Sequence, residues 1–86
     1  MQQKRVLVVD DSKFTLQLVR ARLNANGFAV STASTGEEAI QLAQELQPDV
    51  ILLDIDMPSL NGFDTCRRLK EDDSTKLIPI IFLTAK

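Results

Sequence analysis

Two patterns of apolar residues alternate along the chain. Short apolar runs lie at residues 6–9, 28–32, 50–53 and 78–83, the second only moderately apolar, and helically spaced apolar positions lie between them. Short runs rich in β-branched residues are typical of strands buried on both faces of a parallel sheet. The chain is therefore expected to fold as four strands alternating with three helices.

The first helix is predicted between two capping signals. Asp11 or Ser12 is a suitable N-cap, and Gly27 follows Asn26 where a left-handed C-terminal cap is favoured. The spacing predicts a buried stripe that consists of Leu16, Val19 and Leu23 and is widened by Phe14 and Leu18. This stripe is expected to pack against the sheet.

The second helix is expected to open at Gly36 and to stop at Pro48. Glu37 and Glu38 lie in its first turn, where the helix dipole favours anions, and are interpreted as surface residues. Its expected buried stripe consists of Ala39, Ile40, Ala43 and Leu46.

The third helix is expected after a tight loop bracketed by Pro58 and Gly62. Its predicted inward residues are Phe63, Cys66 and Leu69, and its predicted solvated face carries Arg67, Arg68, Lys70 and Glu71. Cys66 is the only cysteine, so no internal disulfide can form, and a reducing, cytoplasmic setting fits.

The alternating order implies right-handed crossovers and a doubly wound parallel sheet of the α/β class. With 86 residues and no linker or repeat, the chain is expected to form a single domain over residues 1–86. Its net charge of −2 supplies no basic surplus for nucleic acid or an anionic membrane, and it has no histidine for a zinc site or a Ser/His/Asp triad.

Polar residues with candidate chemistry come directly after three of the predicted strands. Asp10 and Asp11 follow the first strand, Asp54 and Asp56 the third, and Thr84 the fourth. Each alone is commonly a plain strand-end residue, but the carboxyl ends of parallel strands meet at one rim. Carboxylates gathered there repel one another unless a cation lies among them, and an all-oxygen site suits Mg²⁺. This arrangement is a setting for phosphoryl transfer to a carboxylate.

Three segments together resemble the response-regulator receiver domain of two-component signalling. They are Val-Leu-Val-Val-Asp-Asp-Ser, Leu-Leu-Asp-Ile-Asp-Met-Pro-Ser-Leu-Asn-Gly and Ile-Pro-Ile-Ile-Phe-Leu-Thr-Ala, and the similarity extends over the whole chain. The resemblance implies a flavodoxin-like fold with strand order 2-1-3-4. It also implies a chemotaxis-regulator-like phosphoacceptor in a phosphorelay.

The resemblance assigns a role to each acid of the rim. Asp54 is the implied phosphoacceptor, Asp11 a direct Mg²⁺ ligand, and Asp10 a residue that holds the metal through water. Asp54 and the backbone carbonyl of Asp56 complete the implied protein ligands of Mg²⁺. The Asp56 side chain is expected at the site entrance, where it can face Lys86.

The resemblance also assigns the phosphate contacts and the partner. Thr84 is the implied switch hydroxyl that bonds the phosphoryl oxygen, and Ala85 keeps the approach open. The donor is expected to be a phosphohistidine on a histidine kinase or phosphotransfer protein, or a small acyl phosphate, because this chain has no histidine. The chain is expected to be a signalling switch rather than an enzyme, with at most self-phosphorylation and autodephosphorylation activity.

Two other interpretations stay open at this point. The segment Asp54-Ile55-Asp56 also resembles the first motif of haloacid-dehalogenase-type phosphatases, but two predicted strands precede it and the acidic pair after the first strand is not part of that motif. The other interpretation is a non-catalytic fold or assembly fragment.

The assembly interpretation rests on the short stretch of chain beyond the fourth strand. Receiver domains have a fourth helix, a fifth strand with a lysine and a fifth helix, so the resemblance implies a truncated domain that lacks this lysine. Strand four is then an apolar edge, and such edges pair with other chains. Self-association through strand four, or binding of the missing segment in trans, is therefore expected.

Overall fold

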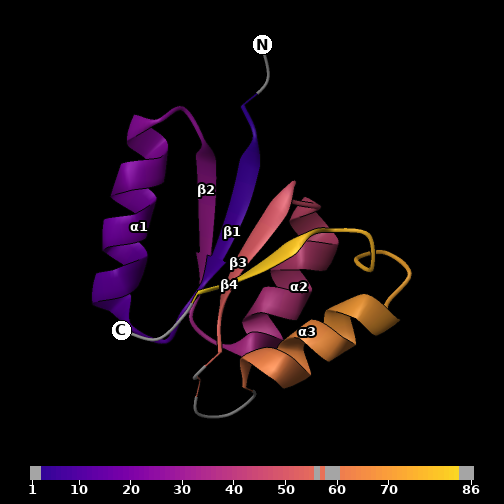
Figure 1. Ribbon diagram of the computed structural model, residues 1–86. Coiled ribbons are helices and arrows are strands. Elements are labelled where there is room, and N and C mark those ends of the chain that lie inside the picture. The colour runs from indigo at the N-terminus through magenta and orange to yellow at the C-terminus, as the bar shows by residue number, and fades with distance from the viewer. Residues whose placement is uncertain (1–2, 56, 58–60, 84–86) are drawn as a thin grey trace.

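The computed structural model describes residues 3–55, 57 and 61–83 of the chain. Their strands are β1 (Arg5–Val9), β2 (Ala29–Ala33), β3 (Val50–Asp54) and β4 (Ile80–Leu83), and their helices are α1 (Lys13–Ala25), α2 (Gly36–Leu46) and α3 (Gly62–Glu71). All paired strands run parallel, in the order β2-β1-β3-β4 (Figure 1). The predicted α/β class and strand order are confirmed.

The helices form two layers, with α1 on one face of the sheet and α2 and α3 on the other (Figure 1). Each face has its own apolar core, because successive strand residues point to opposite faces. On the α1 face, Val6 and Val8 pack with Leu16. On the other face, Leu7 and Val9 pack with a larger group whose buried members are Ala33, Ala39, Ala43, Ile51, Leu53, Met57, Leu69 and Ile78. The sheet is thus buried on both sides, as its apolar runs predict.

The ends of α1 and α2 are fixed by local hydrogen bonds. Ser12 is the N-cap of α1, and its hydroxyl accepts a hydrogen bond from the backbone N–H of Thr15 at 3.3 Å. Gly27 has a φ of +89°, a left-handed conformation that glycine adopts without strain, so its predicted capping role is confirmed. The left-handed residue after α2 is Gln47, with φ 49°, and α2 therefore ends before it reaches Pro48.

Part of the predicted buried stripe of α1 is wrong. Phe14 is 75% exposed and Leu18 is 44% exposed, whereas Leu16 is buried. A helix turns about 100° per residue, so positions two before and two after Leu16 lie on nearly the opposite face. The sheet contacts only a narrow stripe of α1, and Phe14 and Leu18 face solvent.

Phe63 is the corresponding error in α3, since its side chain is 61% exposed. The buried positions of α3 are Gly62, Thr65 and Leu69, and the spacing places Phe63 to one side of them. Its ring packs instead against Phe82 of β4, with centroids 5.4 Å apart.

The fourth strand is shorter than expected, because it begins at Ile80 rather than at Ile78. Pro79 has no N–H to give to a strand ladder, although its carbonyl accepts a hydrogen bond from the N–H of Ile51 at 3.0 Å. Ile78 is buried in the core ahead of the strand. The other strand boundaries differ from the predicted ones by at most one residue.

Candidate functional site

Three aspartates meet at the carboxyl ends of β1 and β3. Asp10 and Asp11 follow β1, Asp54 ends β3, and these strands are neighbours with Val9 paired to Leu53. One carboxylate oxygen of each of the three lies within 4.8 Å of the other two. Asp10 and Asp54 are 2% and 1% exposed, while Asp11 is exposed. The parallel register therefore brings together three of the acids that the sequence singles out, Asp10, Asp11 and Asp54.

Backbone hydrogen bonds hold Asp10 in place. Its N–H donates to the carbonyl of Ala33 at 3.1 Å, which extends the pairing of β1 and β2 by one residue. Its carboxylate Oδ1 accepts a hydrogen bond from the N–H of Ser12 at 2.9 Å. These two hydrogen bonds connect Asp10 to β2 and to the N-cap of α1.

Gly62 brings α3 against the backbone at the end of β3. Its N–H donates to the carbonyl of Ile55 at 2.8 Å. A Cβ at this position would meet the backbone oxygen of Asp54 and would lie 2.6 Å from the Cα of Ile55. Only glycine allows this close approach, whereas the sequence pattern indicated no more than a loop residue at Gly62.

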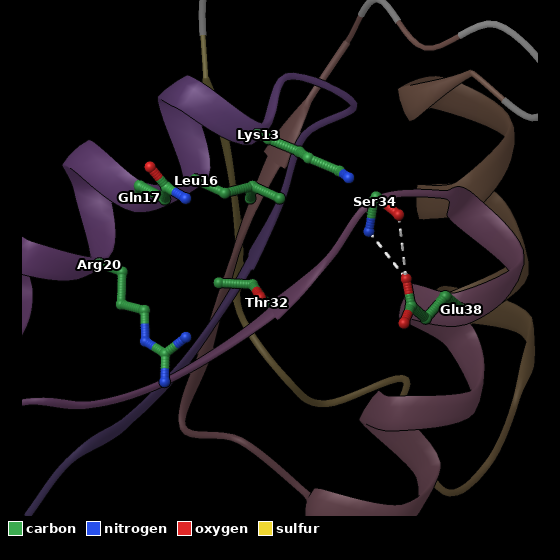
Figure 2. A pocket seen from close by; sticks show the side chains of 7 residues that line it. All are labelled: Lys13, Leu16, Gln17, Arg20, Thr32, Ser34 and Glu38. Atoms are coloured by element: carbon green, nitrogen blue, oxygen red, sulfur yellow. Dashed lines mark hydrogen bonds between the residues drawn. The ribbon is translucent and has the colours of Figure 1, made fainter.

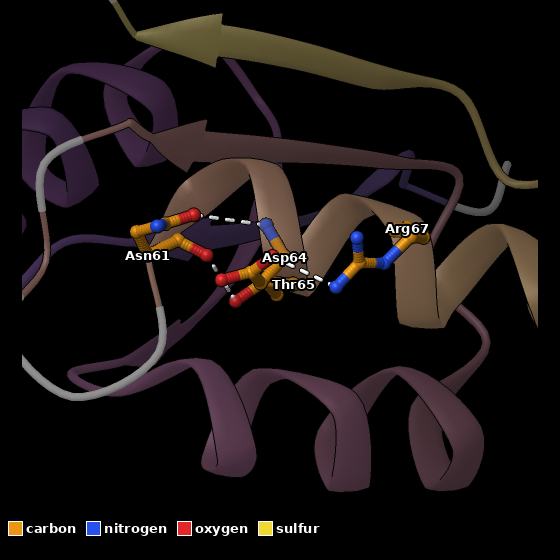
Figure 3. A network of polar contacts seen from close by, with 4 residues as sticks. All are labelled: Asn61, Asp64, Thr65 and Arg67. Carbon is orange, nitrogen blue, oxygen red and sulfur yellow. Dashed lines mark hydrogen bonds and ion pairs between the residues drawn. The ribbon is translucent and has the colours of Figure 1, made fainter.

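The start of α3 is fixed by a small polar network (Figure 3). The side chain of Asn61 accepts a hydrogen bond from the N–H of Asp64 at 2.9 Å, and its backbone carbonyl accepts one from the Thr65 hydroxyl at 3.0 Å. Arg67 pairs with Asp64 at 2.9 Å. This capping network positions Gly62 against β3. An Asn-Gly pair directly before a helical stripe was the available signal for it.

The three aspartates fit a hard divalent cation. They offer oxygen ligands only, from two buried carboxylates and one exposed carboxylate, and Mg²⁺ prefers such ligands while keeping several waters. Three carboxylates this close also repel one another, and a cation among them offsets that repulsion. Within the part of the chain that the structure describes, no other group of acids, histidines or cysteines is gathered in this way.

The remaining predicted site residues lie outside the described residues: Asp56, Thr84, Ala85 and Lys86. Their roles stay predictions.

Several surface predictions are tested by the structure. Glu37 and Glu38 are exposed in the first turn of α2, and Glu38 also accepts a hydrogen bond from the N–H of Ser34 at 2.8 Å. Cys66 is half-buried against the core. Lys70 is exposed, but its Nζ donates to the carbonyls of Lys76 and Ile78 at 3.1 and 2.8 Å, so it also fastens the loop before β4. None of the helices described here is long and apolar enough to cross a membrane.

Comparisons with known proteins agree with this geometry. The sequence profile of the response regulator receiver domain matches residues 6–86. "Response regulator PleD" of Caulobacter vibrioides is 46% identical over 81 residues, which are 94% of this chain and 18% of PleD. "Protein PilH" of Pseudomonas aeruginosa is 43% identical over 82 residues, which are 95% of this chain and 68% of PilH. The chain thus spans less than a fifth of one relative and about two thirds of the other.

Two solved structures share the fold over 99% of this chain. One is the N-terminal domain of a response regulator receiver protein from Methanoculleus marisnigri JR1, with a TM-score of 0.95, 38% identity and 69% of that chain covered. The other is the receiver domain of the sensor histidine kinase PA1611 from Pseudomonas aeruginosa PAO1, with a magnesium ion in its active site cleft. Its TM-score is 0.92, its identity is 28%, and 70% of that chain is covered.

These matches also decide between the two protein families considered for Asp54. The receiver profile spans the acidic pair after β1, the acid at the end of β3 and the start of α3. The phosphatase motif accounts only for the acid at the end of β3. The chain belongs to the response regulator receiver domain family of two-component signalling.

Proposed function

We propose that this chain is the phosphoacceptor module of a two-component phosphorelay and that Asp54 accepts the phosphoryl group. The observation that carries the proposal is the meeting of Asp54 with Asp10 and Asp11 at the carboxyl ends of adjacent parallel strands. Receiver domains as a family receive phosphate from histidine kinases or phosphotransfer proteins. The proposed donor for this chain is a phosphohistidine of such a partner.

In the proposed reaction, a carboxylate oxygen of Asp54 attacks the phosphorus of the donor in line with the leaving nitrogen. A new O–P bond forms while the N–P bond breaks, and the electron pair stays on the imidazole nitrogen, which takes up a proton. The product is an acyl phosphate on Asp54. Asp54 is 1% exposed, so its carboxylate is held in place and bulk water has little access to it. This burial favours transfer of the phosphoryl group to Asp54 over its hydrolysis by water.

Asp10, Asp11 and Asp54 are the described residues that hold Mg²⁺ in this proposal, joined by the backbone carbonyl of Asp56. When bound, the cation would neutralise negative charge on the phosphoryl oxygens. Asp11 is exposed and suited to direct ligation, and buried Asp10, already engaged by Ser12, is suited to a contact through water.

The residues beyond the described part of the chain complete the proposal. Thr84 bonds a phosphoryl oxygen, and Ala85 keeps the approach open. Asp56 and Lys86 flank the site entrance and control how water reaches the acyl phosphate. An unchanged dephosphorylation rate in Lys86→Ala would contradict this role. The chain acts as one domain, as a cytoplasmic signalling switch whose own chemistry is limited to self-phosphorylation and autodephosphorylation.

Intact mass spectrometry after incubation with acetyl phosphate and Mg²⁺ tests the phosphoacceptor directly. One phosphate is expected on the chain and none on Asp54→Asn. Asp49→Asn is the matched control, because Asp49 lies just before the same strand and should leave phosphorylation intact. Phosphate on Asp54→Asn, or equal phosphorylation with and without Mg²⁺, would overturn the assignment.

Exposed apolar residues in β4 and in the loop before it favour a second proposed property, self-association. Leu77 is 87% exposed and Ile81 is 55% exposed, so they offer apolar surface that a second chain can bury. Light scattering at micromolar concentration is expected to show a dimer or larger species that Ile81→Lys converts to a monomer. A monomer before substitution would contradict self-association and leave the phosphoacceptor proposal untouched.

A further inference from the structure

A polar groove lies beside the carboxyl end of the edge strand β2, with α1 on one side and the start of α2 on the other (Figure 2). Its volume is about 290 Å³, and none of the three clustered aspartates lines it. Its lining side chains come from Lys13, Leu16, Gln17, Arg20, Thr32, Ser34 and Glu38. Because β2 is an edge strand and α1 and α2 cover opposite faces of the sheet, the groove lies at one corner of the sheet.

The charge of the groove favours anions. Lys13 and Arg20 are exposed, and neither makes a hydrogen bond or an ion pair with the described residues. The one acid, Glu38, already accepts hydrogen bonds from the N–H and the hydroxyl of Ser34 at 2.8 and 3.3 Å. Two available cations therefore face one occupied carboxylate.

The spacing of the two cations indicates an extended ligand. Lys13 and Arg20 are seven positions apart in the sequence, which places them on one side of α1, about 10 Å apart along its axis. Figure 2 shows them at opposite ends of the groove, with Leu16 between them and Thr32 opposite. Both cations are therefore best engaged by a ligand with more than one negative charge along its length.

The backbone of β2 offers a way to hold such a ligand. The N–H of Ala29 donates to Lys4 and the carbonyl of Ala33 accepts from Asp10, so alternate residues starting from Ala29 direct their backbone groups toward β1. The intervening residues, including Thr32, direct theirs away from the sheet, because β2 is an edge strand. Such edge groups pair readily with an added strand.

We propose that this groove is a docking site for an extended acidic segment of a partner protein. The segment adds to β2 as an outer strand, and its acidic side chains on the α1 face pair with Lys13 and Arg20. Backbone pairing with β2 supplies affinity for an extended chain, and the two cations select acidic sequences. The site goes beyond the proposed phosphoacceptor function and uses none of its residues.

Fluorescence anisotropy with a labelled peptide of alternating glutamate and valine tests the proposal. This peptide is expected to bind the chain, and the same peptide with glutamine in place of glutamate is expected to bind more weakly. The double variant Lys13→Gln/Arg20→Gln should weaken binding about fivefold, the scale of two exposed ion pairs. Arg22→Gln is the matched control, since Arg22 is an exposed cation of α1 outside the groove and should not change binding.

Thr32→Pro tests the added strand separately, because proline removes the outward N–H of an edge strand without removing a bond to β1. It should weaken peptide binding, and circular dichroism verifies that the variant is folded. If the variant does not fold, N-methylation of the peptide's backbone amides on the side that pairs with β2 replaces it as the test. The absence of peptide binding would overturn the proposal, as would an affinity that is unchanged in the double variant. Full competition by inorganic phosphate would show a small-anion site instead. Loss of self-association in the double variant would show that a second copy occupies the groove.

Discussion

The two ends of β3 carry the same residue type in opposite settings. Asp49 lies before the strand, is exposed, and accepts a hydrogen bond from the N–H of Arg5 at 2.8 Å. Asp54 ends the strand, is 1% exposed, and lies beside two further carboxylates. Asp49 stabilises the fold by accepting a backbone hydrogen bond, whereas Asp54 belongs to a cluster that favours an added cation. The direction of the parallel strands, rather than the residue type, separates the structural acid from the candidate functional one.

The same division extends to the neighbouring strands. At the amino end, a guanidinium N–H of Arg5 donates to the carbonyl of Gln47 at 2.6 Å. Asp72 in the loop before β4 accepts hydrogen bonds from the N–H and hydroxyl of Ser74 and from the side chain of Gln44. Asp49 and Asp72 therefore accept hydrogen bonds, but neither belongs to a cluster of three carboxylates among the described residues. Four predictions test this contrast between the two ends.

The largest expected effect is on the carboxyl end, where Gly62 touches the backbone of Asp54. Gly62→Ala should lower the free energy of unfolding by about 1–3 kcal/mol, because the added Cβ forces α3 and β3 apart. Urea denaturation measures the change. Gly27→Ala is the control: it has open space around it, and its positive φ predicts a loss of only about 1 kcal/mol. Equal losses in the two variants would contradict the packing role of Gly62.

Magnesium should stabilise the folded chain by binding at the carboxyl end of β3 and not at its amino end. A cation at tenfold its dissociation constant adds about 1.4 kcal/mol to the free energy of unfolding, which corresponds to a rise in Tm of roughly 6–11 °C in a domain of this size. Thermal unfolding with Mg²⁺ and with EDTA measures the rise. Asp54→Asn should lose most of it and Asp49→Asn none. An equal rise in both variants would place the cation elsewhere.

At the amino end, Asp49→Ala should cost about 0.5 kcal/mol, because the lost hydrogen bond to Arg5 is exposed and water replaces it. Urea denaturation at neutral pH provides the value, and Asp49→Asn, which keeps an acceptor oxygen, should recover most of it. A loss as large as that of Gly62→Ala would mean that the two ends of β3 contribute to stability alike.

The smallest effect concerns Asp72, whose pKa is lowered from 3.8 by hydrogen bonds from Ser74 and then Gln44. A lowered pKa in the folded state adds stability above the unfolded value and loses it as the pH falls through the folded value. The difference in unfolding free energy between the chain and Asp72→Asn should therefore shrink below about pH 4. A difference that grows on acidification would contradict the assignment.

The sequence by itself determined the elements, their order and the rim at which the acids gather. Short apolar runs rich in β-branched residues are typical of strands buried within a parallel sheet, and the carboxyl ends of such strands share one edge. The caps at Ser12 and Gly27 were also predictable, because capping depends on residues close in the chain. Local chemistry was sufficient for these features.

Other features were decided only by the tertiary structure. Periodicity shows that a helix has an apolar face but not how wide a stripe the sheet covers, which is why Phe14, Leu18 and Phe63 were predicted inward and lie exposed. Three further features depend on segments that are distant in the sequence. They are the contact of Gly62 with Asp54, the different burial of Asp10 and Asp11, and the groove at the edge of β2. Such features depend on how the helices pack on the sheet, and no local pattern specifies them.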